Sequence, residues 1–392
     1  MNETYAIIGA GIAGASVAYH LGRRTDADVH VFERGTTGDE TTARSIAQFG
    51  YYGDSTQHRM KRYGMQLYNE FFADPRADLR YEYTGLLSVA TSETGARELH
   101  RATVKGDAAL GKTTGTGWDR DPVRVFEPDE LREQLLIPSL DTNAITGALF
   151  RPRMGYMATP AALAEEFVAR AMEEGVVFHF ETAVEEIVTK GDRVTAVRAD
   201  GEYPVSAVVC ASGPWNVQLA RSVGVELPVR HTIAPVIRLD PAIEIRYNIP
   251  TIVEMEGPHA IHRRQPDEWL VGYNPVEGYD LQQRFDPDEL GDSVPEGIKQ
   301  GMRDVTSRLT PAIADAPIVD EWVGVRSQTP DDNPIVGWTE LSGFSIAAFH
   351  TSGIQLAPAV GRMIADQLID GEPGSQYDSL SITRFEGYED CQ

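Results

Sequence analysis

The chain has 392 residues, a length that accommodates two domains with separate hydrophobic cores. Its formal net charge of −24 at pH 7 argues against a nucleic-acid partner and against an anionic membrane surface, because like charges repel. The sequence contains no run of about 20 apolar residues, so we expect no membrane span.

The surplus of acidic residues and the scarcity of lysine are typical of proteins from a salt-rich cytoplasm, where salt screens self-repulsion. We therefore predict a cytoplasmic protein of a halophilic organism, with an ordinary acidic cytosolic protein as the alternative. The N-terminus has no basic region before its first apolar segment, so we expect no signal peptide.

The first predicted elements are a strand and a helix joined by a glycine-rich turn. Ala6–Ile8 is a short apolar run, as expected of a buried strand. Gly9, Gly11 and Gly14 follow in a G-x-G-x-x-G pattern. In such a turn the first glycine permits the tight bend and the second lets the backbone approach a pyrophosphate. The third lets the helix pack closely on the strand.

The segment after the turn completes a dinucleotide-binding unit. A helix is predicted over Ile12–Arg24, and its N-terminus offers free N–H groups to the pyrophosphate. The next strand is Val29–Glu33, and Glu33 lies about 20 residues past Gly14, the spacing of a carboxylate that binds ribose hydroxyls. Arg34 would suit a 2′-phosphate, but the carboxylate favours the unphosphorylated ribose of FAD or NAD.

Further pieces of the same domain are scattered along the chain. Thr159–Gly175 is an amphipathic helix with Pro160 at its first position, and Val176–Phe180 follows it as a strand. Ala183–Thr189 and Arg193–Ala199 alternate like a pair of β-strands. The remaining predicted pieces are strands at Val205–Ala211 and Gly343–Phe349 and a helix at Leu356–Ile369.

A second domain is predicted between these pieces. Gln57–Phe72 has a helical pattern, and later strands that follow one another without helices favour an antiparallel sheet. These strands are Arg230–Leu239, Thr251–Glu256, Ala260–Arg264 and Glu268–Tyr273. We therefore predict an α/β fold, with a Rossmann-like nucleotide-binding domain interleaved with a substrate domain on a mainly antiparallel sheet. The nucleotide-binding domain takes residues 1–45, 146–220 and 320–392, and the substrate domain takes residues 46–145 and 221–319.

Metal binding is not predicted. The two cysteines, Cys210 and Cys391, cannot form a zinc site, and no group of His, Asp and Glu has metal-ligand spacing. Cys210 lies in an apolar strand and is expected to be a small buried residue.

Several motifs follow one another in an order that is informative as a set. After the N-terminal glycines and Glu33-Arg34 come Thr42–Gln48, Cys210–Trp215, Trp322–Ser327 and Gly353–Gly361. Their order and spacing resemble the flavin-dependent D-amino acid oxidase superfamily, in the branch with glycine oxidase, sarcosine oxidase and D-arginine dehydrogenase. The likeness to D-arginine dehydrogenase rests on Arg44-Ser45 followed by Tyr52-Gly53, and on Trp322-x-Gly-x-Arg-Ser.

The resemblance implies FAD as the cofactor. The glycine turn would hold the pyrophosphate, Glu33 the adenosine ribose, and the backbone of Val184 the adenine. The loop Ser352–Gln355 would lie by the pyrimidine end of the flavin, where its N–H groups face the negative charge of the reduced ring. The full set of expected cofactor-binding residues is Gly9, Gly11, Ile12, Ala13, Gly14, Glu33, Arg34, Thr42, Arg44, Ser45, Ala47, Gln48, Val184, Ala211, Gly213, Trp215, Arg326, Ser352, Gly353, Ile354 and Gln355.

Arg326 is the first candidate for a catalytic residue. In the family, an arginine after Trp-x-Gly-x holds the substrate carboxylate, and two parallel hydrogen bonds from its planar guanidinium fix the orientation. The resemblance implies hydride transfer from the substrate Cα to flavin N5. The resulting imine would be hydrolysed by water to a keto acid and ammonia.

Three further residues are catalytic candidates. Tyr52 would lie over the substrate as a lid or hydrogen-bond donor, with Tyr51 as the competing choice because the alignment needs a one-residue gap. His350 comes just before the flavin loop, where it would assist removal of the amine proton or have a structural role. Gln48 stands where D-arginine dehydrogenase has a histidine near the flavin.

Two absences bear on flavin attachment and on the electron acceptor. Sarcosine oxidases attach flavin to a cysteine upstream of a Thr-Pro-Asp turn; here Thr329–Asp331 is present, but Gly324 fills the cysteine position. We therefore expect non-covalent FAD. The stretch Gly272–Asp280 lacks the lysine that activates oxygen in those oxidases, which favours a dehydrogenase that passes electrons to a quinone or carrier.

We therefore predict an FAD-dependent oxidoreductase that oxidises the C–N bond of a small amino-acid substrate, a D-amino acid, as a dehydrogenase. The alternative is a glycine/sarcosine-type oxidase that uses oxygen on an N-methyl amino acid. Two other interpretations are an NAD(P)-linked reductase, which would need a second glycine-rich turn that we do not find, and a flavin-carrying subunit that only supports a partner. No oligomeric state is predicted.

Overall fold

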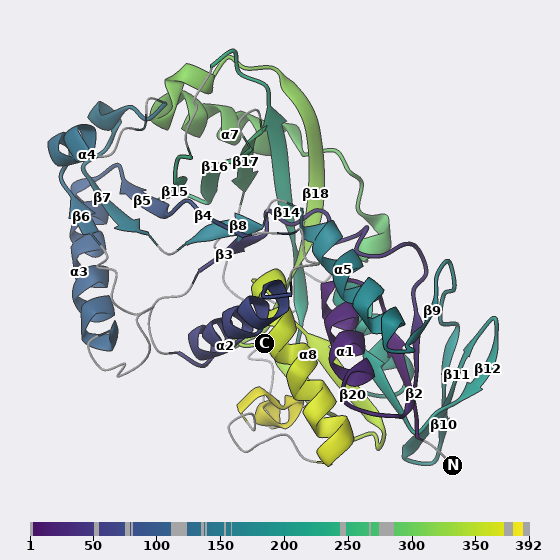
Figure 1. Cartoon of the computed structure of the whole chain (residues 1–392). Helices are drawn as coiled ribbons and strands as arrows, with labels where there is room; N and C mark the ends of the chain where they lie inside the picture. Colours follow the sequence, from purple (N-terminus) through teal and green to yellow (C-terminus); the bar gives the residue numbers. More distant parts are fainter. Residues whose placement is uncertain are drawn as a thin grey trace.

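The structure is a computed structural model that describes residues 3–50, 55–74, 79, 81–110, 124–134, 137, 139–152, 154–157, 159–243, 248–265, 268–273, 286–371 and 379–386. Within this part of the chain, two large sheets form the frame of the molecule (Figure 1). The predicted α/β class is confirmed, with mixed parallel and antiparallel pairing. Tyr51, Tyr52, Cys391 and residues 274–280 of the stretch without lysine lie outside the described residues.

The first large sheet contains the predicted dinucleotide-binding strands. Its order is β19 (Ile335–Trp338), β20 (Phe344–Ala348), β13 (Ala207–Cys210), β1 (Thr4–Ile8), β2 (Asp28–Phe32) and β9 (Val177–His179). All neighbours are parallel except β19 and β20. The strands β1 and β13 are buried along nearly their whole length, as expected of parallel strands covered on both faces.

Three helices pack together beside this sheet: α1 (Ile12–Gly22), α5 (Pro160–Glu173) and α8 (Gly353–Asp370). Small residues bring α1 and α8 close together. The hydroxyl of Ser16 donates a hydrogen bond to the carbonyl of Ala357 (2.9 Å), and a Cβ added to Gly361 would lie 2.8 Å from the carbonyl oxygen of Ser16. This close packing fixes the N-termini of both helices relative to the glycine turn.

The second large sheet is mainly antiparallel, as predicted. Its order is β18 (Ile318–Gln328), β14 (Arg230–Leu239), β17 (Glu268–Tyr273), β16 (His259–Gln265), β15 (Thr251–Glu254), β5 (Leu86–Ala90), β7 (Gly147–Arg151) and β6 (Arg124–Phe126). Only the pair β15 and β5 is parallel among these described strands. The helix α7 (Glu296–Leu309) buries Met302 and Val305 in the core of this sheet together with Trp269.

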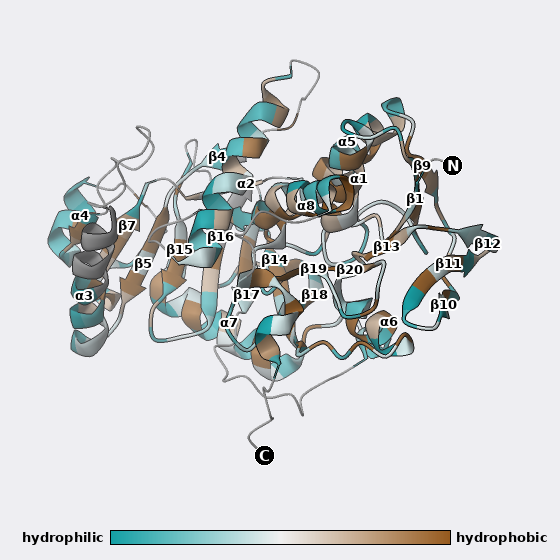
Figure 2. Cartoon of the chain, turned by 90° about the horizontal axis from the view of Figure 1, so that it is seen from below, coloured by the Kyte–Doolittle hydropathy of each residue, from teal (hydrophilic) through white to brown (hydrophobic). Residues whose placement is uncertain are grey.

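Smaller elements join the two sheets. A sheet of β3 (Gln48–Phe49), β8 (Gly155–Met157) and β4 (Tyr81–Tyr83) leads toward α2 (Thr56–Phe72), which packs on α8. The other elements are α3 (Glu93–Leu110), α4 (Pro128–Gln134), α6 (Asn216–Ser222), and the sheet of β10 (Glu186–Lys190), β11 (Arg193–Ala199) and β12 (Gly201–Pro204). Figure 2 shows hydrophobic residues (brown) on strands such as β5 and β14, with hydrophilic residues (teal) along α2 and α4.

Strand pairing differs in detail from the expected organisation. The strand β7 and all but the first two residues of β18 lie in ranges assigned to the nucleotide-binding domain, yet both strands pair within the second large sheet. The division into two domains stays a prediction. The helix α8 begins at Gly353 rather than Leu356, so the expected flavin loop forms its first turn. Across the described residues, no helix combines the length and apolarity that a membrane crossing requires.

Candidate active site

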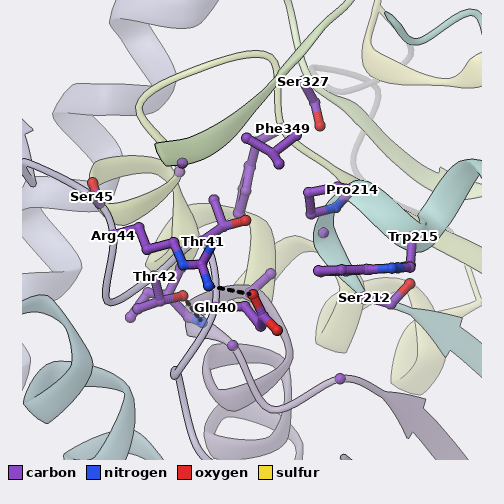
Figure 3. A pocket seen from close by; sticks show the side chains of 18 of the residues that line it. Glu40, Thr41, Thr42, Arg44, Ser45, Ser212, Pro214, Trp215, Ser327 and Phe349 are labelled. Carbon is purple, nitrogen blue, oxygen red and sulfur yellow. Dashed lines mark hydrogen bonds and ion pairs between the residues drawn. The ribbon is translucent and has the colours of Figure 1, made fainter. Parts of the chain in front are cut away.

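A cavity of about 770 Å³ opens where the two large sheets meet, a volume typical of small-molecule sites. One wall contains the glycine turn, and another contains residues of β14 and β18. Figure 3 shows Glu40, Thr42 and Arg44 on one side of the cavity, with Pro214 and Trp215 on the other.

The cavity brings together nearly all the site residues predicted in the described part of the chain. Gly14 and Gln355 are the exceptions, since neither lines the wall. The predicted residues that line it are Gly9, Gly11, Ile12, Ala13, Glu33, Arg34, Thr42, Arg44, Ser45, Ala47, Gln48, Val184, Ala211, Gly213, Trp215, Arg326, His350, Ser352, Gly353 and Ile354.

The glycine turn has the geometry that its sequence predicts. Gly9 has a φ of +104°, which a residue with a side chain rarely adopts. A Cβ added to Gly14 would lie 1.9 Å from the carbonyl oxygen of Gly9, so only glycine permits this approach of helix and strand. Gly14 therefore supports the glycine turn on the side that faces away from the cavity.

Glu33 is held in place by the main chain. One carboxylate oxygen accepts a hydrogen bond from the N–H of Ala10 (2.7 Å), and the other accepts one from the N–H of Gly35 (2.8 Å). A carboxylate oxygen can accept more than one hydrogen bond, so both oxygens keep capacity for a ligand hydroxyl. Glu33 lines the cavity, which suits the predicted contact with a ribose.

The segment that carries Thr42 and Arg44 is tied to both halves of the site. The hydroxyl of Thr42 accepts a hydrogen bond from the N–H of Ile12 (3.1 Å) at the start of α1. On the other side, the Arg44 guanidinium donates to the carbonyl of Val323 (3.1 Å), and the indole N–H of Trp322 donates to the carbonyl of Arg44 (2.9 Å). These bonds connect the glycine turn to β18.

The first turn of α8 closes another side of the cavity. Ser352 precedes it in a left-handed conformation (φ +59°) and makes no side-chain cap hydrogen bond. Ser352, Gly353 and Ile354 line the cavity, and the first N–H groups of a helix have no partner within that helix. Gln355 is buried, and its side-chain oxygen accepts a hydrogen bond from the N–H of Gly50 (3.0 Å).

Arg326 lies on β18, directly opposite Thr232 of β14, and lines the cavity. Burial lowers the pKa of Arg326 from its usual value. A guanidinium nevertheless stays charged at neutral pH, and a partly buried one favours an anionic ligand. Arg326 is therefore a suitable anchor for a carboxylate.

His350 also lines the cavity, and its hydrogen bonds define its protonation. Its Nδ1 accepts a hydrogen bond from the N–H of Thr329 (3.0 Å), so in the neutral ring the proton is on Nε2, which lies 3.3 Å from a carboxylate oxygen of Asp332. Burial, opposed by Asp332 and assisted by Arg326, lowers the pKa of His350. Because the lone pair of Nδ1 is occupied, this geometry favours a positioning role over the predicted removal of an amine proton.

Sequence reasoning missed several residues of the cavity wall. Asp288 contacts both Arg34 and Trp215 from the 3₁₀ helix η5 (Pro287–Glu289). No motif marks it, because its partners are distant in sequence. Other wall residues that were not predicted include Ala234, Pro235 and Val236 of β14 and Phe349 before α8.

These residues fit a dinucleotide with a flavin ring. The N-termini of α1 and α8 both face the cavity, which suits the negative charges of a pyrophosphate and a reduced flavin. In addition, the side-chain amide nitrogen of Gln48 is buried and has no hydrogen-bond partner among the described residues. A buried donor without a partner is costly, so a ligand acceptor is expected beside it.

Comparisons with known proteins give the class of this fold and site. The family described as FAD dependent oxidoreductase matches residues 4–367. The solved L-proline dehydrogenase from P. horikoshii has the same fold, with a TM-score of 0.82 and 21% identity over 99% of both chains. The chain therefore belongs to the FAD-dependent oxidoreductase family, and its cofactor is FAD.

Two curated relatives cover nearly all of this chain. Glycine oxidase from Geobacillus kaustophilus is 26% identical over 97% of each chain. The 4-methylaminobutanoate oxidase (formaldehyde-forming) from Paenarthrobacter nicotinovorans is 28% identical over 98% of this chain and 46% of its own length. The present chain thus spans about half the length of the second relative.

Proposed function

We propose that the protein oxidises the C–N bond of an amino acid whose carboxylate is bound by Arg326. The observation that carries this proposal is the place of Arg326 on the wall of the cavity into which the glycine turn and the first turn of α8 also open. One cavity thus offers an anchor for a carboxylate and a site for the cofactor. A D-amino acid is the first candidate substrate, because the motifs around Arg44 and Trp322 resemble those of D-arginine dehydrogenase.

The chemistry divides between cofactor and protein. Bound FAD supplies the acceptor for the two electrons that leave the substrate. Arg326 would hold the carboxylate in one orientation and so limit the positions available to the Cα–H bond. Loss of hydride from Cα converts the amine to an imine, and water hydrolyses the imine to a keto acid and ammonia. His350 would support the wall beside Arg326 in its neutral form.

The proposed cofactor contacts follow from the cavity wall. The glycine turn would face the pyrophosphate, Glu33 the ribose, and the first turn of α8 the pyrimidine end of the flavin. We propose non-covalent attachment, because Gly324 lines the cavity at the position where sarcosine oxidases carry the attaching cysteine. We further propose a dehydrogenase that passes electrons to a quinone or carrier.

A second candidate substrate is an N-methyl amino acid or glycine, oxidised with oxygen. The observation that favours it is the similarity over nearly the whole chain to the 4-methylaminobutanoate oxidase and to glycine oxidase. Peroxide formation with such substrates would distinguish this candidate from the first.

The acidic composition supports a separate proposal about the environment. With a net charge of −24, the folded chain repels itself at low ionic strength, so we propose a salt-rich cytoplasm as its working environment. A rise of the thermal unfolding midpoint between 0.1 and 2 M KCl would support this proposal, and a fall would contradict it.

The role of Arg326 is testable by ligand binding. We expect Arg326→Ala to weaken the binding of the amino-acid substrate, or of a non-reactive carboxylate analogue, by about 10- to 100-fold, since hydrogen bonds to charged groups are at stake. Binding is measured by the change in the flavin spectrum. Arg238→Ala, which removes a surface arginine paired with Asp320 on the same sheet, is the matched control. Equal affinity in Arg326→Ala and Arg238→Ala would contradict the proposal.

A further inference from the structure

A single carboxylate oxygen joins three distant segments at one end of the cavity. Oδ1 of Asp288 accepts a hydrogen bond from the guanidinium of Arg34 (2.8 Å) and another from the indole N–H of Trp215 (3.0 Å). The guanidinium carbon of Arg34 also lies 3.9 Å from the centroid of the Trp215 ring. All three residues line the cavity. Asp288 therefore holds a stacked cation–π pair in one arrangement.

The segment around Asp288 has two more attachments to the cavity wall. We name residues 286–292 the acidic strap. Its Asp286 accepts a hydrogen bond from the side-chain amide of Gln218 (3.0 Å), and its Asp292 lies 3.2 Å from the guanidinium of Arg44. Gln218 and Arg44 both line the cavity. The acidic strap is thus attached to the wall at its two ends and at its centre.

The pair of Arg34 and Trp215 lies next to residues predicted to bind the nucleotide end of the cofactor. Arg34 directly follows Glu33, the residue proposed to bind the ribose, and Trp215 ends the short helix η3 (Gly213–Trp215) beside the predicted contact Gly213. Figure 3 shows the Trp215 ring facing the cavity across from Glu40 and Arg44. The acidic strap therefore lies against wall residues next to the predicted nucleotide contacts Glu33 and Gly213.

The contacts of Asp288 are too exposed to matter much for folding. The side chains of Arg34 and Asp288 are 41% and 52% exposed, and exposed ion pairs contribute little to stability. Their effect on a bound ligand differs, because a wall that is already ordered does not have to be ordered when the ligand binds. Order that is already present in the wall would therefore lower the cost of binding the cofactor.

We propose that Asp288 is a positioning residue for FAD: by holding Arg34 and Trp215 at the nucleotide end, it makes opening of the acidic strap a requirement for cofactor release. The inference rests on the binding of FAD in this cavity and is independent of which amino acid is oxidised. Non-covalent retention would then depend on charge pairs that salt screens.

The test compares FAD release from the holoenzyme and from two variants that lose the same charge. Asp288→Asn removes the carboxylate that holds the pair. Glu289→Gln is the matched control, because the neighbouring Glu289 is exposed and its side chain forms no hydrogen bond or ion pair with a described residue. Release is followed by the rise of free-flavin fluorescence after dilution into buffer without substrate.

We expect Asp288→Asn to release FAD about three- to tenfold faster than the parent, the scale of an exposed ion pair together with a cation–π contact. Glu289→Gln should stay within about twofold of the parent, a change too small to involve such contacts. Raising KCl from 0.1 to 1 M should speed release from the parent more than from Asp288→Asn. Trp215→Phe, which keeps an aromatic ring and loses the N–H donor, should also release FAD faster.

Equal release rates in Asp288→Asn and Glu289→Gln would overturn the proposal. The same loss of thermal stability in Asp288→Asn with and without FAD would also overturn it, because it would indicate a merely structural role. If Asp288→Asn does not fold, Trp215→Phe decides the question, and an unchanged release rate in that variant would overturn the proposal. Because no substrate is present, failure of the amino-acid assignment would not affect these rates. If Asp288→Asn releases FAD faster than Glu289→Gln but the protein oxidises no amino acid, only the proposed function is contradicted.

Discussion

The N–H of Thr329 lies 3.0 Å from Nδ1 of His350, and this hydrogen bond defines which nitrogen of the imidazole carries the proton. A backbone N–H can only donate, so Nδ1 must be the acceptor, and Nε2 carries the hydrogen toward Asp332. The backbone of one strand end thereby orients a histidine at the wall of the active site.

This geometry predicts the ring state of His350 in solution. Because burial lowers the pKa of His350, we expect a neutral ring at pH 7 with the proton on Nε2. Nitrogen NMR of protein with labelled histidine, with His350→Gln used for assignment, measures this state. A proton on Nδ1, or a doubly protonated ring at pH 7, would be incompatible with the hydrogen bond from Thr329.

Two glycines of the first turn are predicted to respond differently to the same substitution. A Cβ on Gly14 would lie 1.9 Å from a main-chain oxygen, so Gly14→Ala should displace α1 and destabilise the protein by about 3 kcal/mol or more. A Cβ on Gly11 would meet only the hydroxyl of Thr42, at 3.4 Å. Gly11→Ala should therefore fold normally and lose FAD affinity, because its methyl group occupies the approach to the pyrophosphate.

Thermal unfolding of FAD-free protein and titration with FAD separate these two effects. Gly14→Ala should lower the unfolding midpoint far more than Gly11→Ala does. Normal FAD affinity in Gly11→Ala would contradict the assignment of the turn to the pyrophosphate.

The buried ring of His20 makes the stability of the protein depend on pH. Burial, assisted by the charges of Arg362 and Arg24, lowers the pKa of His20 to about 3. Its unfolded pKa is near 6.5, so between about pH 3 and 6.5 the unfolded chain binds a proton that the folded chain does not. The stabilisation is complete above pH 6.5 and is lost progressively as the pH falls toward 3.

We expect His20→Gln to reduce the slope of unfolding free energy against pH, between pH 5 and 6.5, by about 1 kcal/mol per pH unit, because the unfolded ring is only partly protonated near pH 6.5. Denaturant titrations at several pH values measure this slope. The parent protein, measured under the same conditions, is the reference. An unchanged slope in His20→Gln would show that this ring is not held neutral by the fold.

Substitution by valine is predicted to change stability in opposite directions at two buried threonines, Thr232 and Thr306. The hydroxyl of Thr232 has no hydrogen-bond partner among the described residues, whereas that of Thr306 donates to the carbonyl of Met302 (2.6 Å). An unsatisfied buried hydroxyl is costly, so Thr232→Val should stabilise the FAD-free protein by about 1 kcal/mol, and Thr306→Val should destabilise it by a similar amount. Thermal unfolding compares the two, and a clear loss of stability in Thr232→Val would mean that its hydroxyl has a partner.

The parts of the site that depend on local spacing were predictable from the sequence. The glycine turn, Glu33 and the first turn of α8 are each defined within a few residues, and the structure brings their wall residues into one cavity. The antiparallel strands of the second sheet were also predictable, because alternation and the absence of helices between them are local signals.

The parts that depend on distant pairing were not predictable. Nothing near Asp288 indicates Arg34, 254 positions away, as its partner. The strand β18 was recognised as a motif around Arg326 and not as a strand of 11 residues, because its ladder with β14 is a long-range pairing. Gln355 was expected at the cofactor as part of a loop whose backbone N–H groups face the flavin, and that stays a prediction. The hydrogen bond of its side chain with Gly50 depends on the packing of α8 and could not be predicted.

The most direct test of the proposed function is an anaerobic titration of the purified protein, in high salt, with D- and L-amino acids, glycine and sarcosine, while the visible flavin absorption is recorded. We predict bleaching by a D-amino acid and slow recovery in air, as expected of a dehydrogenase. Bleaching only by glycine or sarcosine, with rapid peroxide formation in air, would support the second candidate. If none of these compounds bleaches the bound flavin, the assignment of Arg326 to an amino-acid carboxylate is contradicted.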